Sequence, residues 1–266
     1  MKLWGYEAYK NGVISPSEID EVSLAARHIK SFDTNDFIGI KEKERVKALG
    51  EVFTPENIVI DMTDLDGIKQ LSYTLDSTFL EPSCGTGNFL VELLARKLSV
   101  AIFFYQNNED KDKTALDVGF MRAVASIYGV DIMVDNIYES KSRLLNMCSC
   151  AYQEVTGEEM DKSLYKSIQF IVDRNIILGD AMKKQMLKSK ALRKIKKNSL
   201  NSLDNFEGDT VEWKVYEWKF DGETVQRIAW AGDTLDICLA EAGIDSECYD
   251  PVHYLSLYKQ KDICFD

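Results

Sequence analysis

The chain has 266 residues and a formal net charge of −12 at pH 7. This length suits one large α/β domain, or one such domain with a small appendage. The negative charge argues against nucleic-acid binding by the whole surface. No apolar run approaches the ~18 residues that cross a membrane, and residues 1–5 lack the apolar core of a signal peptide. We therefore expect a cytoplasmic protein with no membrane partner.

The cysteines and histidines do not have the spacing of a metal site. The six cysteines include no Cys-x-x-Cys pair, and the only histidines are His28 and His253. This pattern argues against structural zinc, and a chain of this size without a secretory signal needs no disulfide framework. We expect no metal, and we expect most cysteines to be small buried side chains.

Two helices are predicted in the first quarter of the chain. The sequence Ser15-Pro16-Ser17-Glu18 is a capping box with proline at the first helical position, so a helix should run over about 16–31. Thr54 and Pro55 are a good N-cap and first residue for a second helix over about 55–65. Phe53 then lies just before this helix. It either packs on its own helix as a hydrophobic staple or covers a bound planar ligand, and the local sequence alone favours the staple.

A strand, a glycine turn and a helix follow. The run 73–80 reads as a strand, the sequence Glu81-Pro82-Ser83-Cys84-Gly85-Thr86-Gly87-Asn88 as a turn, and 89–105 as a helix. Glycines let the backbone approach a ligand closely, and the first N–H groups of a helix point at it. No Gly-Lys-Ser/Thr follows, which excludes a P-loop. We call residues 81–89 the cradle.

The same alternation recurs twice. A helix at about 115–125 leads to a strand at 126–131, and a helix at about 134–150 leads to the apolar stretches 168–172 and 175–180. Three strands thus end in an acid and are followed by a helix, and the acids are Glu81, Asp131 and Asp180. This order predicts a mostly parallel, doubly wound sheet with helices on both faces. Ligands of such sheets bind at the carboxyl ends of the strands, where all three acids fall.

The last third of the chain has a different character. Eight positive charges without an acid among them form a basic run at 183–197, which we expect to be helical or partly disordered: Lys183, Lys184, Lys188, Lys190, Arg193, Lys194, Lys196 and Lys197. Strands at 211–220 and 224–230, joined by Asp221-Gly222, predict a hairpin. Its aromatic residues either stack on bases or, as is commoner, bury against the sheet or a partner. A helix at 232–242 and an edge strand at 254–258 complete the prediction.

The ordered motifs resemble a known family. The cradle, the Phe53-Thr54-Pro55 element upstream, Tyr128-Gly129-Val130-Asp131 and Gly179-Asp180 are similar to the motifs of S-adenosylmethionine-dependent DNA adenine-N6 methyltransferases, above all those of restriction-modification systems. The resemblance covers about residues 48–182. It implies a Rossmann-like class I methyltransferase fold with an N-terminal helical segment (1–47), a cofactor-binding core (48–182), and a C-terminal part (183–266) that carries the basic run and the hairpin.

The resemblance also implies roles for individual residues. Glu81 would lie near the ammonium group of S-adenosylmethionine, Asp131 would accept from the ribose hydroxyls, and Asp180 would accept from the adenine amine. Phe53 would close over the methionine side. The full set of implied cofactor-binding residues is Phe53, Thr54, Pro55, Glu81, Pro82, Ser83, Gly85, Gly87, Asn88, Phe89, Asp131, Ile132, Asp180 and Ala181. DNA is the implied partner, and the basic run would contact its phosphates, with a solvated helix as the alternative.

The catalytic motif of that family is missing. Its members carry Asn/Asp-Pro-Pro followed by an aromatic residue that stacks on the flipped base, whereas none of the four prolines here are adjacent. The nearest fragment contains Asp250, Pro251 and Tyr254, and these are weak catalytic candidates beside the plainer interpretation of an Asp-Pro turn.

Three functions remain open from the sequence. The first is a DNA adenine-N6 methyltransferase that works with a second subunit or with an unusual catalytic loop. The second is an inactive methyltransferase-like module that binds cofactor or DNA as a regulatory or assembly subunit. The third is a methyltransferase for a small molecule or a protein, since a fold alone does not fix the substrate.

Overall fold

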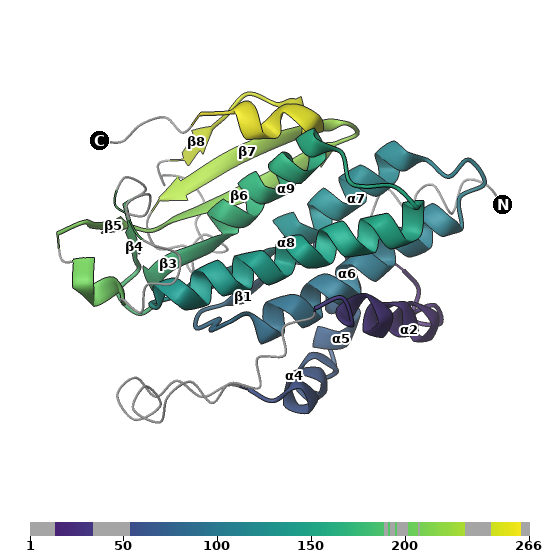
Figure 1. Ribbon diagram of the computed structural model, residues 1–266, viewed down its shortest axis with the longest axis horizontal. Helices are drawn as coiled ribbons and strands as arrows, with labels where there is room; N and C mark the ends of the chain where they lie inside the picture. Colours follow the sequence, from purple (N-terminus) through teal and green to yellow (C-terminus); the bar gives the residue numbers. More distant parts are fainter. Residues whose placement is uncertain are drawn as a thin grey trace.

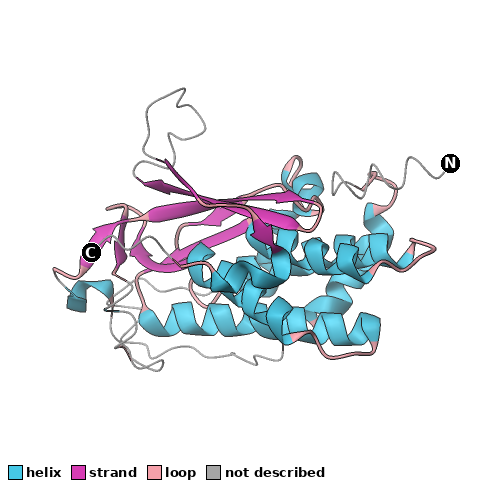
Figure 2. Cartoon of the chain, turned by 90° about the horizontal axis from the view of Figure 1, so that it is seen from above, coloured by secondary structure: helices cyan, strands magenta, loops and turns pink. Residues whose placement is uncertain are grey.

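The computed structural model describes residues 14–33, 54–188, 191, 195, 202–206, 208–231 and 246–261. It has an α/β architecture with two sheets. Figure 2 shows the strands gathered on one side of the molecule and most of the helices on the other. Within the described ranges, no helix is both long and apolar enough to cross a membrane.

The larger sheet has five strands in the order β1-β2-β3-β4-β5. The first three strands are parallel to one another, whereas β4 pairs antiparallel with β3 and β5 pairs antiparallel with β4. The sheet is therefore mixed, with its parallel part at the start of the chain. The strands are β1 (Phe79–Glu81), β2 (Ile127–Asp131), β3 (Ile176–Asp180), β4 (Gln185–Leu187) and β5 (Thr210–Glu212).

Each parallel crossover consists of two helices, which lie side by side in Figure 1. The first crossover contains α6 (Asn88–Gln106) and α7 (Lys113–Ala125), and the second contains α8 (Val134–Thr156) and α9 (Lys162–Asn175). Helices α6 and α8 pack on β2, and α7 and α9 pack on each other and on the second sheet. Asp112 and Asp161 cap α7 and α9 through hydrogen bonds from the first backbone N–H groups of these helices.

Three shorter helices of the described ranges precede the sheet. They are α2 (Ile19–Lys30), α4 (Glu56–Thr63) and α5 (Ile68–Ser72). The predicted capping box is half formed, because Glu18 accepts hydrogen bonds from both the backbone N–H and the hydroxyl of Ser15, but no side chain caps the first N–H groups of α2, which begins at Ile19 and not at Pro16. Helix α2 packs its apolar face against α6.

The second sheet contains the predicted hairpin. It is formed by β6 (Lys214–Asp221), β7 (Thr224–Ala231), β8 (Ser246–Cys248) and β9 (Val252–His253), and Gly222 takes the positive φ of 53° that the turn requires. Tyr216 and Trp218 of β6 face the rest of the protein, whereas Trp230 of β7 lies on the opposite face of the hairpin, where it is half-buried and donates its indole N–H to Glu217 at 3.2 Å. Trp213 is 2% exposed, and Trp218 donates its indole N–H to Asn175 at 2.9 Å. The hairpin therefore buries its aromatic face on the protein, which was the commoner of the two interpretations.

Several predicted elements differ from the structure. Strand β1 is shorter than predicted, since residues 73–78 form turns, a single β-bridge residue at Thr74 and irregular backbone before Phe79. The apolar stretch 168–172 is part of helix α9, and residues 254–258 belong to a 3-10 helix (Tyr254–Lys259) rather than an edge strand. The predicted helix at 232–242 lies outside the described residues.

The start of the basic run is extended, not helical. Lys183 and Lys184 form the turn after β3, and Lys184 has a φ of 53°. The following residues form β4, so no helix directly follows the third acid, although Ala191 later in the run is helical. A tight turn brings the chain straight back along β3, and the doubly wound alternation ends there.

One hydrophobic core joins the three predicted segments. Its buried residues extend from Ile14 in the N-terminal segment to Leu257 near the end of the described chain. Tyr128 in β2 donates its hydroxyl to the backbone oxygen of Tyr216 in β6, at 2.7 Å, which ties the two sheets together. The C-terminal part is thus packed on the core.

Lys97 is a buried lysine that holds the chain in front of β1. Its side chain is fully buried in α6, and Nζ donates to the backbone oxygens of Thr74 at 2.6 Å, Leu75 at 3.4 Å and Ser77 at 2.7 Å. Burial lowers the pKa of Lys97 from 10.5 to about 7. These bonds hold the turn between α5 and β1 against α6.

We predict that Lys97→Met lowers the free energy of unfolding by about 2–4 kcal/mol, because three buried carbonyl groups lose their donor. Urea denaturation measures this loss. The matched control is Lys113→Met, which removes an exposed lysine paired with Glu158 and should cost less than about 1 kcal/mol.

The same variant should reveal the pKa of Lys97. Between about pH 7 and 10.5 the unfolded chain holds a proton on this lysine that the folded chain has released, so wild-type stability should rise with pH in that window. The difference between wild type and Lys97→Met should therefore grow from pH 7 to pH 9. A constant difference would contradict a lowered pKa.

Candidate functional site

The three acids predicted from the sequence lie at one edge of the sheet. Glu81, Asp131 and Asp180 are the last residues of β1, β2 and β3, which are adjacent and parallel. Neighbouring strands lie about 4.8 Å apart, so the three backbones form one row of strand ends. The structure thus brings these acids to the edge where ligands of parallel sheets bind.

Asp131 fastens the cradle to the second strand. Its side chain is 7% exposed, and Oδ2 accepts the backbone N–H of Gly85 at 2.9 Å. Its other oxygen, Oδ1, accepts the N–H of Met133 at 2.8 Å and the amide of Asn136 at 3.1 Å. The carboxylate therefore joins the turn after β1 to the start of α8. A ribose diol would reach it only by sharing or replacing these bonds.

Two separate constraints, backbone conformation and close packing, require glycine in the cradle. Gly85 and Gly87 have φ values of 51° and 95°, which side chains of L-residues rarely adopt. At Gly87 a Cβ atom would also lie 2.9 Å from the Cβ of Ser140 in α8, whereas at Gly85 it would meet nothing within 4 Å. Gly87 is thus a packing contact between α6 and α8, and Gly85 faces open space.

Arg143 of α8 holds the cradle in place, and no sequence pattern indicated this role. This arginine of α8 is 9% exposed and donates to the backbone oxygen of Thr86 at 2.7 Å and to the side-chain oxygen of Asn88 at 2.9 Å. It also forms a two-pronged ion pair with Asp33, which follows α2, with a shortest distance of 2.6 Å. An i, i+4 pattern cannot reveal a pair separated by 110 residues.

The residues around Glu81 leave its carboxylate available. Glu81 is half-buried, and this burial raises the pKa of its carboxyl. The backbone N–H of Ser83, which donates to Oε1 at 3.3 Å, lowers the pKa by a smaller amount. Pro82 and Ser83 are exposed beside it. Among the described residues, Glu81 is the strand-end acid with the fewest protein hydrogen bonds, so it is the one best placed to accept from a ligand.

The upstream element contacts the cradle through one bond. The side-chain amide of Asn88 donates to the backbone oxygen of Thr54 at 3.0 Å, directly before Pro55 and α4. Phe89 lies in the first turn of α6 and is half-buried. Phe53 lies outside the described residues, so its predicted role stays a prediction.

The Asp180 side chain accepts hydrogen bonds from the turn that directly follows it. Its Oδ1 accepts the backbone N–H groups of Met182 and Lys183, and Oδ2 lies 3.1 Å from the Lys183 ammonium. Partial burial opposes ionisation, but the Lys183 hydrogen bonds and charge lower the pKa of this carboxyl. Ala181 is half-buried beside it, and Ile132, in the corresponding place after β2, accepts the Leu203 N–H through its backbone oxygen at 2.7 Å.

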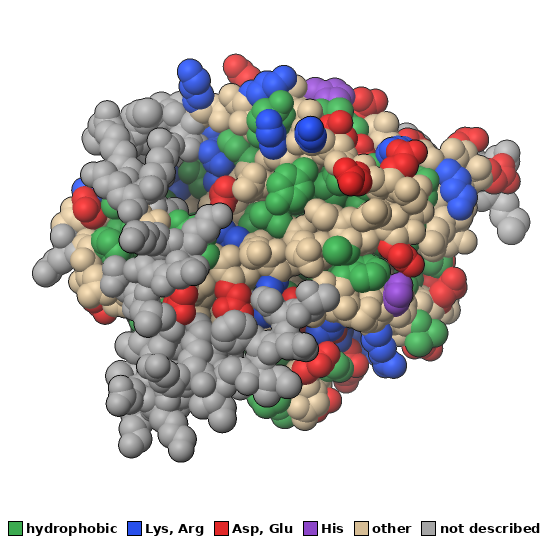
Figure 3. Space-filling view, in the orientation of Figure 1, with side chains coloured by type: hydrophobic (Ala, Val, Ile, Leu, Met, Phe, Trp, Pro, Cys, Tyr) green, Lys and Arg blue, Asp and Glu red, His purple; other side chains and the backbone are tan. Residues whose placement is uncertain are grey.

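The basic run is only partly described. Besides its bond to Asp180, the Lys183 ammonium lies 3.7 Å from a carboxylate oxygen of Asp204. The Lys188 ammonium donates to the backbone oxygen of Gly208. Lys184 lies in the same turn as Lys183. The remaining cations lie outside the described residues: Lys190, Arg193, Lys194, Lys196 and Lys197. In the described part of the face shown in Figure 3, Lys and Arg side chains are mixed with Asp and Glu around an apolar centre.

The catalytic candidates lie far from the row of acids. The Tyr254 hydroxyl donates to Asp117 at 2.9 Å, and Tyr152 donates to the other oxygen of the same carboxylate. Asp117 is in the first half of α7, which runs toward the amino end of β2. Asp250 and Pro251 are exposed residues next to β9. The structure therefore does not bring Asp250, Pro251 and Tyr254 together with Asp131.

Comparisons of the chain with protein-family models, with curated proteins and with solved structures find no match. In the described ranges, no group of three or more His, Cys, Asp or Glu side chains is arranged to hold a metal ion. The description of the site thus depends on its own geometry: three acids on adjacent strand ends, and a glycine turn held by Asp131 and Arg143.

We predict that Gly87→Ala destabilises the protein more than Gly157→Ala, which is its matched control. Both glycines have a positive φ, at 95° and 73°, so each alanine should cost about 1–2 kcal/mol of backbone strain. Only Gly87→Ala also forces apart α6 and α8 at Ser140, which should add about 1–3 kcal/mol. Urea denaturation measures both. Equal losses would show that the close approach at Ser140 is relieved at little cost.

Proposed function

We propose that this chain is the cofactor-binding part of an S-adenosylmethionine-dependent DNA methyltransferase that acts on adenine N6, of the restriction-modification or mobile-element type. The observation that carries the proposal is the row formed by Glu81, Asp131 and Asp180 on three adjacent parallel strands, with the glycine turn fastened between the first two. In this proposal the fold is a Rossmann-like methyltransferase core that ends at β3 and continues with two antiparallel strands.

The described residues fit S-adenosylmethionine in part. Glu81 offers a half-buried carboxylate for the ammonium group, and the open space beside Gly85 leaves room for the methionine part. The ribose would lie against Asp131 and Ile132, and the adenine against Asp180 and Ala181. Asp131 and Asp180 already accept protein hydrogen bonds, so binding there requires these bonds to be shared or exchanged.

In such a reaction the cofactor, when bound, supplies an electrophilic methyl group on its sulfonium. The chain's own residues would bind the cofactor and fix the direction in which the methyl group points. The in-line transfer of the methyl group also needs acceptors that orient the target amine and a site that excludes water. The Asn/Asp-Pro-Pro-aromatic sequence that offers such acceptors in the family is absent. We therefore propose that a second polypeptide completes the catalytic site.

A second candidate function follows from the same absence. The chain would then be a methyltransferase-like module that binds the cofactor or DNA without catalysis, as a regulatory or assembly subunit. Cofactor binding does not separate the two candidates, because an inactive module can also bind. Methyl transfer by the complete complex does.

We predict that the isolated chain binds S-adenosylmethionine and that Glu81→Gln weakens binding about 10-fold or more, because it removes a charged acceptor for the ammonium group. Titration calorimetry measures both affinities. The matched control is Glu21→Gln, an exposed acid of α2 that should leave the affinity unchanged. No binding by the intact chain would overturn the cofactor assignment.

The assay for catalysis is transfer of labelled methyl groups to mixed-sequence DNA by the chain together with its partner. We expect label on adenine N6, and a loss with Glu81→Gln that matches the loss of cofactor binding. Binding without any transfer would favour the non-catalytic module.

We predict that the basic run contributes to DNA binding through phosphate contacts. Changing Lys190, Lys194 and Lys197 to Gln should lower the slope of log affinity against log salt by up to about 3, at ~0.9 per contact. The matched control changes three exposed lysines of α9 and the last 3-10 helix to Gln, namely Lys162, Lys166 and Lys259. The two triple variants therefore have the same net charge as each other. If both triple variants change the slope equally, general charge and not the basic run controls binding.

A further inference from the structure

Strand β1 is the end strand of its sheet in the described chain. It pairs with β2 on one side, and the other strands follow on from β2 in the order β3, β4 and β5. Within the described ranges, the other edge of the strand that carries the cradle has no paired strand. Open edges of sheets offer backbone N–H and C=O groups to another strand, and proteins usually cover or protect them.

Leu80 is the residue that faces this edge. Phe79 donates its N–H toward β2, to the backbone oxygen of Ser126 at 2.9 Å, so the alternation along the strand turns the N–H and C=O of Leu80 away from β2. Phe79 lies under the Lys97 ammonium of α6, which places the Leu80 side chain on the opposite face of the sheet. There it is 44% exposed.

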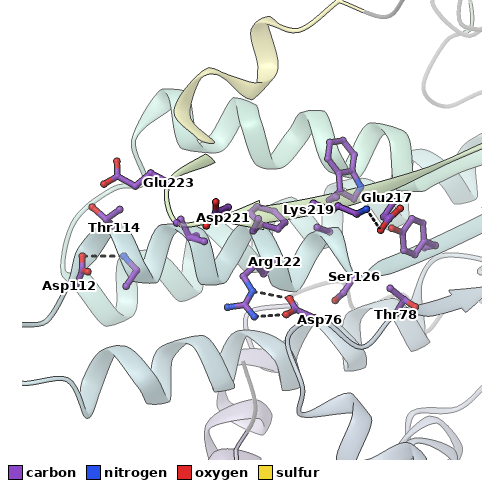
Figure 4. A pocket seen from close by; sticks show the side chains of 17 residues that line it. Asp76, Thr78, Asp112, Thr114, Arg122, Ser126, Glu217, Lys219, Asp221 and Glu223 are labelled. Carbon is purple, nitrogen blue, oxygen red and sulfur yellow. Dashed lines mark hydrogen bonds and ion pairs between the residues drawn. The ribbon is translucent and has the colours of Figure 1, made fainter. Parts of the chain in front are cut away.

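A groove of about 950 Å³ begins next to β1 on this face. Its floor includes Thr78, directly before β1, and Tyr128, the β2 residue in register with Leu80. One wall is helix α7 and the other is the β6–β7 hairpin, as Figure 4 shows. The groove and the open edge are thus two parts of one surface.

The groove is acidic. Its lining contains five carboxylates and two cations, and both cations pair with acids of the same groove, Arg122 with Asp76 and Lys219 with Glu217. The labelled side chains in Figure 4 show these pairs and the acids on both walls. The remaining acids are Asp112, Asp221 and Glu223. A partner of this surface should therefore be positively charged.

Further exposed apolar side chains lie before β1, most of them on helices that pack against α6 and outside the lining of the groove. Six of the nine large hydrophobic side chains that are exposed in the described chain fall between residues 58 and 80. Ile58 and Met62 lie one turn apart on α4, and Ile68 and Leu71 lie one turn apart on α5. Exposed apolar side chains concentrated in one stretch are typical of an interaction site.

We propose that the open edge of β1 and the adjoining acidic groove bind a strand of a second, different polypeptide, apolar at alternate positions and flanked by lysine or arginine. The strand adds to the sheet beside Leu80, and its basic flank enters the groove. This inference rests on the proposed function, since the bound polypeptide is the one that completes the catalytic site. A strand parallel to β1 starts over the groove and ends next to Glu81 at the cradle.

A second copy of the chain fits this surface poorly. Two copies would bring two acid-lined grooves together, and opposed like charges cost affinity. The edge alone is also a weak anchor, because β1 has three residues and only Leu80 offers backbone groups outward. Its hydrogen bonds stabilise by about 1 kcal/mol each, so the charged groove and the apolar contacts must supply most of the affinity.

The experiment is site-specific photo-crosslinking of the full-length chain in its native cells. Leu80→p-benzoylphenylalanine places the probe at the edge, and Leu24→p-benzoylphenylalanine is the matched control on α2, where the side chain is 66% exposed. We expect one adduct at position 80 that is absent at position 24. Mass spectrometry should map it to an apolar segment with Lys or Arg flanks.

A synthetic peptide of the mapped segment then tests the mode of binding to the purified chain. We expect it to slow hydrogen exchange of the Leu80 amide at least 10-fold and to bind more weakly as salt rises. Leu80→Asp should weaken binding at least 10-fold, whereas Leu24→Asp should not, with thermal unfolding to verify that both variants fold.

Four outcomes would overturn the inference: an adduct with a second copy, an adduct within the same chain, no adduct specific to position 80, or a peptide that binds without protecting Leu80. Calorimetry with S-adenosylmethionine on the isolated chain is independent of all of these. If the chain binds the peptide but not the cofactor, the docking site is supported and the proposed function fails. If it binds the cofactor but not the peptide, the cofactor assignment is supported and the docking site fails.

Discussion

The carboxylate of Asp131 is the constraint on which the candidate site depends. It is buried at the end of β2, and its oxygens accept from the turn after β1 and from the first residues of α8. A buried carboxylate is tolerated only where donors satisfy it. The three donors here belong to two different crossovers. A single charge therefore fixes the distance between the glycine turn and the start of the next helix, and the row of strand ends keeps its shape.

The sequence predicted the part of the fold that follows from local rules. Alternating strands and helices gave the parallel order, and the acids at the strand ends followed from that order. The hairpin at Asp221-Gly222 needed only its turn residues and period-two pattern. Short apolar runs could not be assigned from local rules. Residues 168–172 suit a buried strand or a buried helix equally, and in the structure they are part of the longer helix α9. A charged run gave no sign that part of it would form β4.

The parts of the site that could not be predicted are held by contacts between distant residues. Arg143 reaches the cradle and Asp33 at the same time, and Lys97 donates to carbonyl groups 20 to 23 residues away. Both are buried basic side chains whose acceptors come mostly from turns. In the sequence they look like polar positions on amphipathic helices. Only the arrangement of the helices shows that each one holds a turn next to β1.

The two surfaces on β1 lie at different places along one strand and can work together. The cofactor candidates are at its carboxyl end, whereas the groove begins at Thr78, in front of its amino end. Three residues of strand span about 10 Å. A polypeptide that docks in the groove and runs along the edge therefore need not cover the cradle, and its last residues arrive beside Glu81. Under the proposed function, acceptors for the target amine would come from this polypeptide, because Asp131 and Asp180 already hold the chain's own turns and Glu81 is assigned to the cofactor.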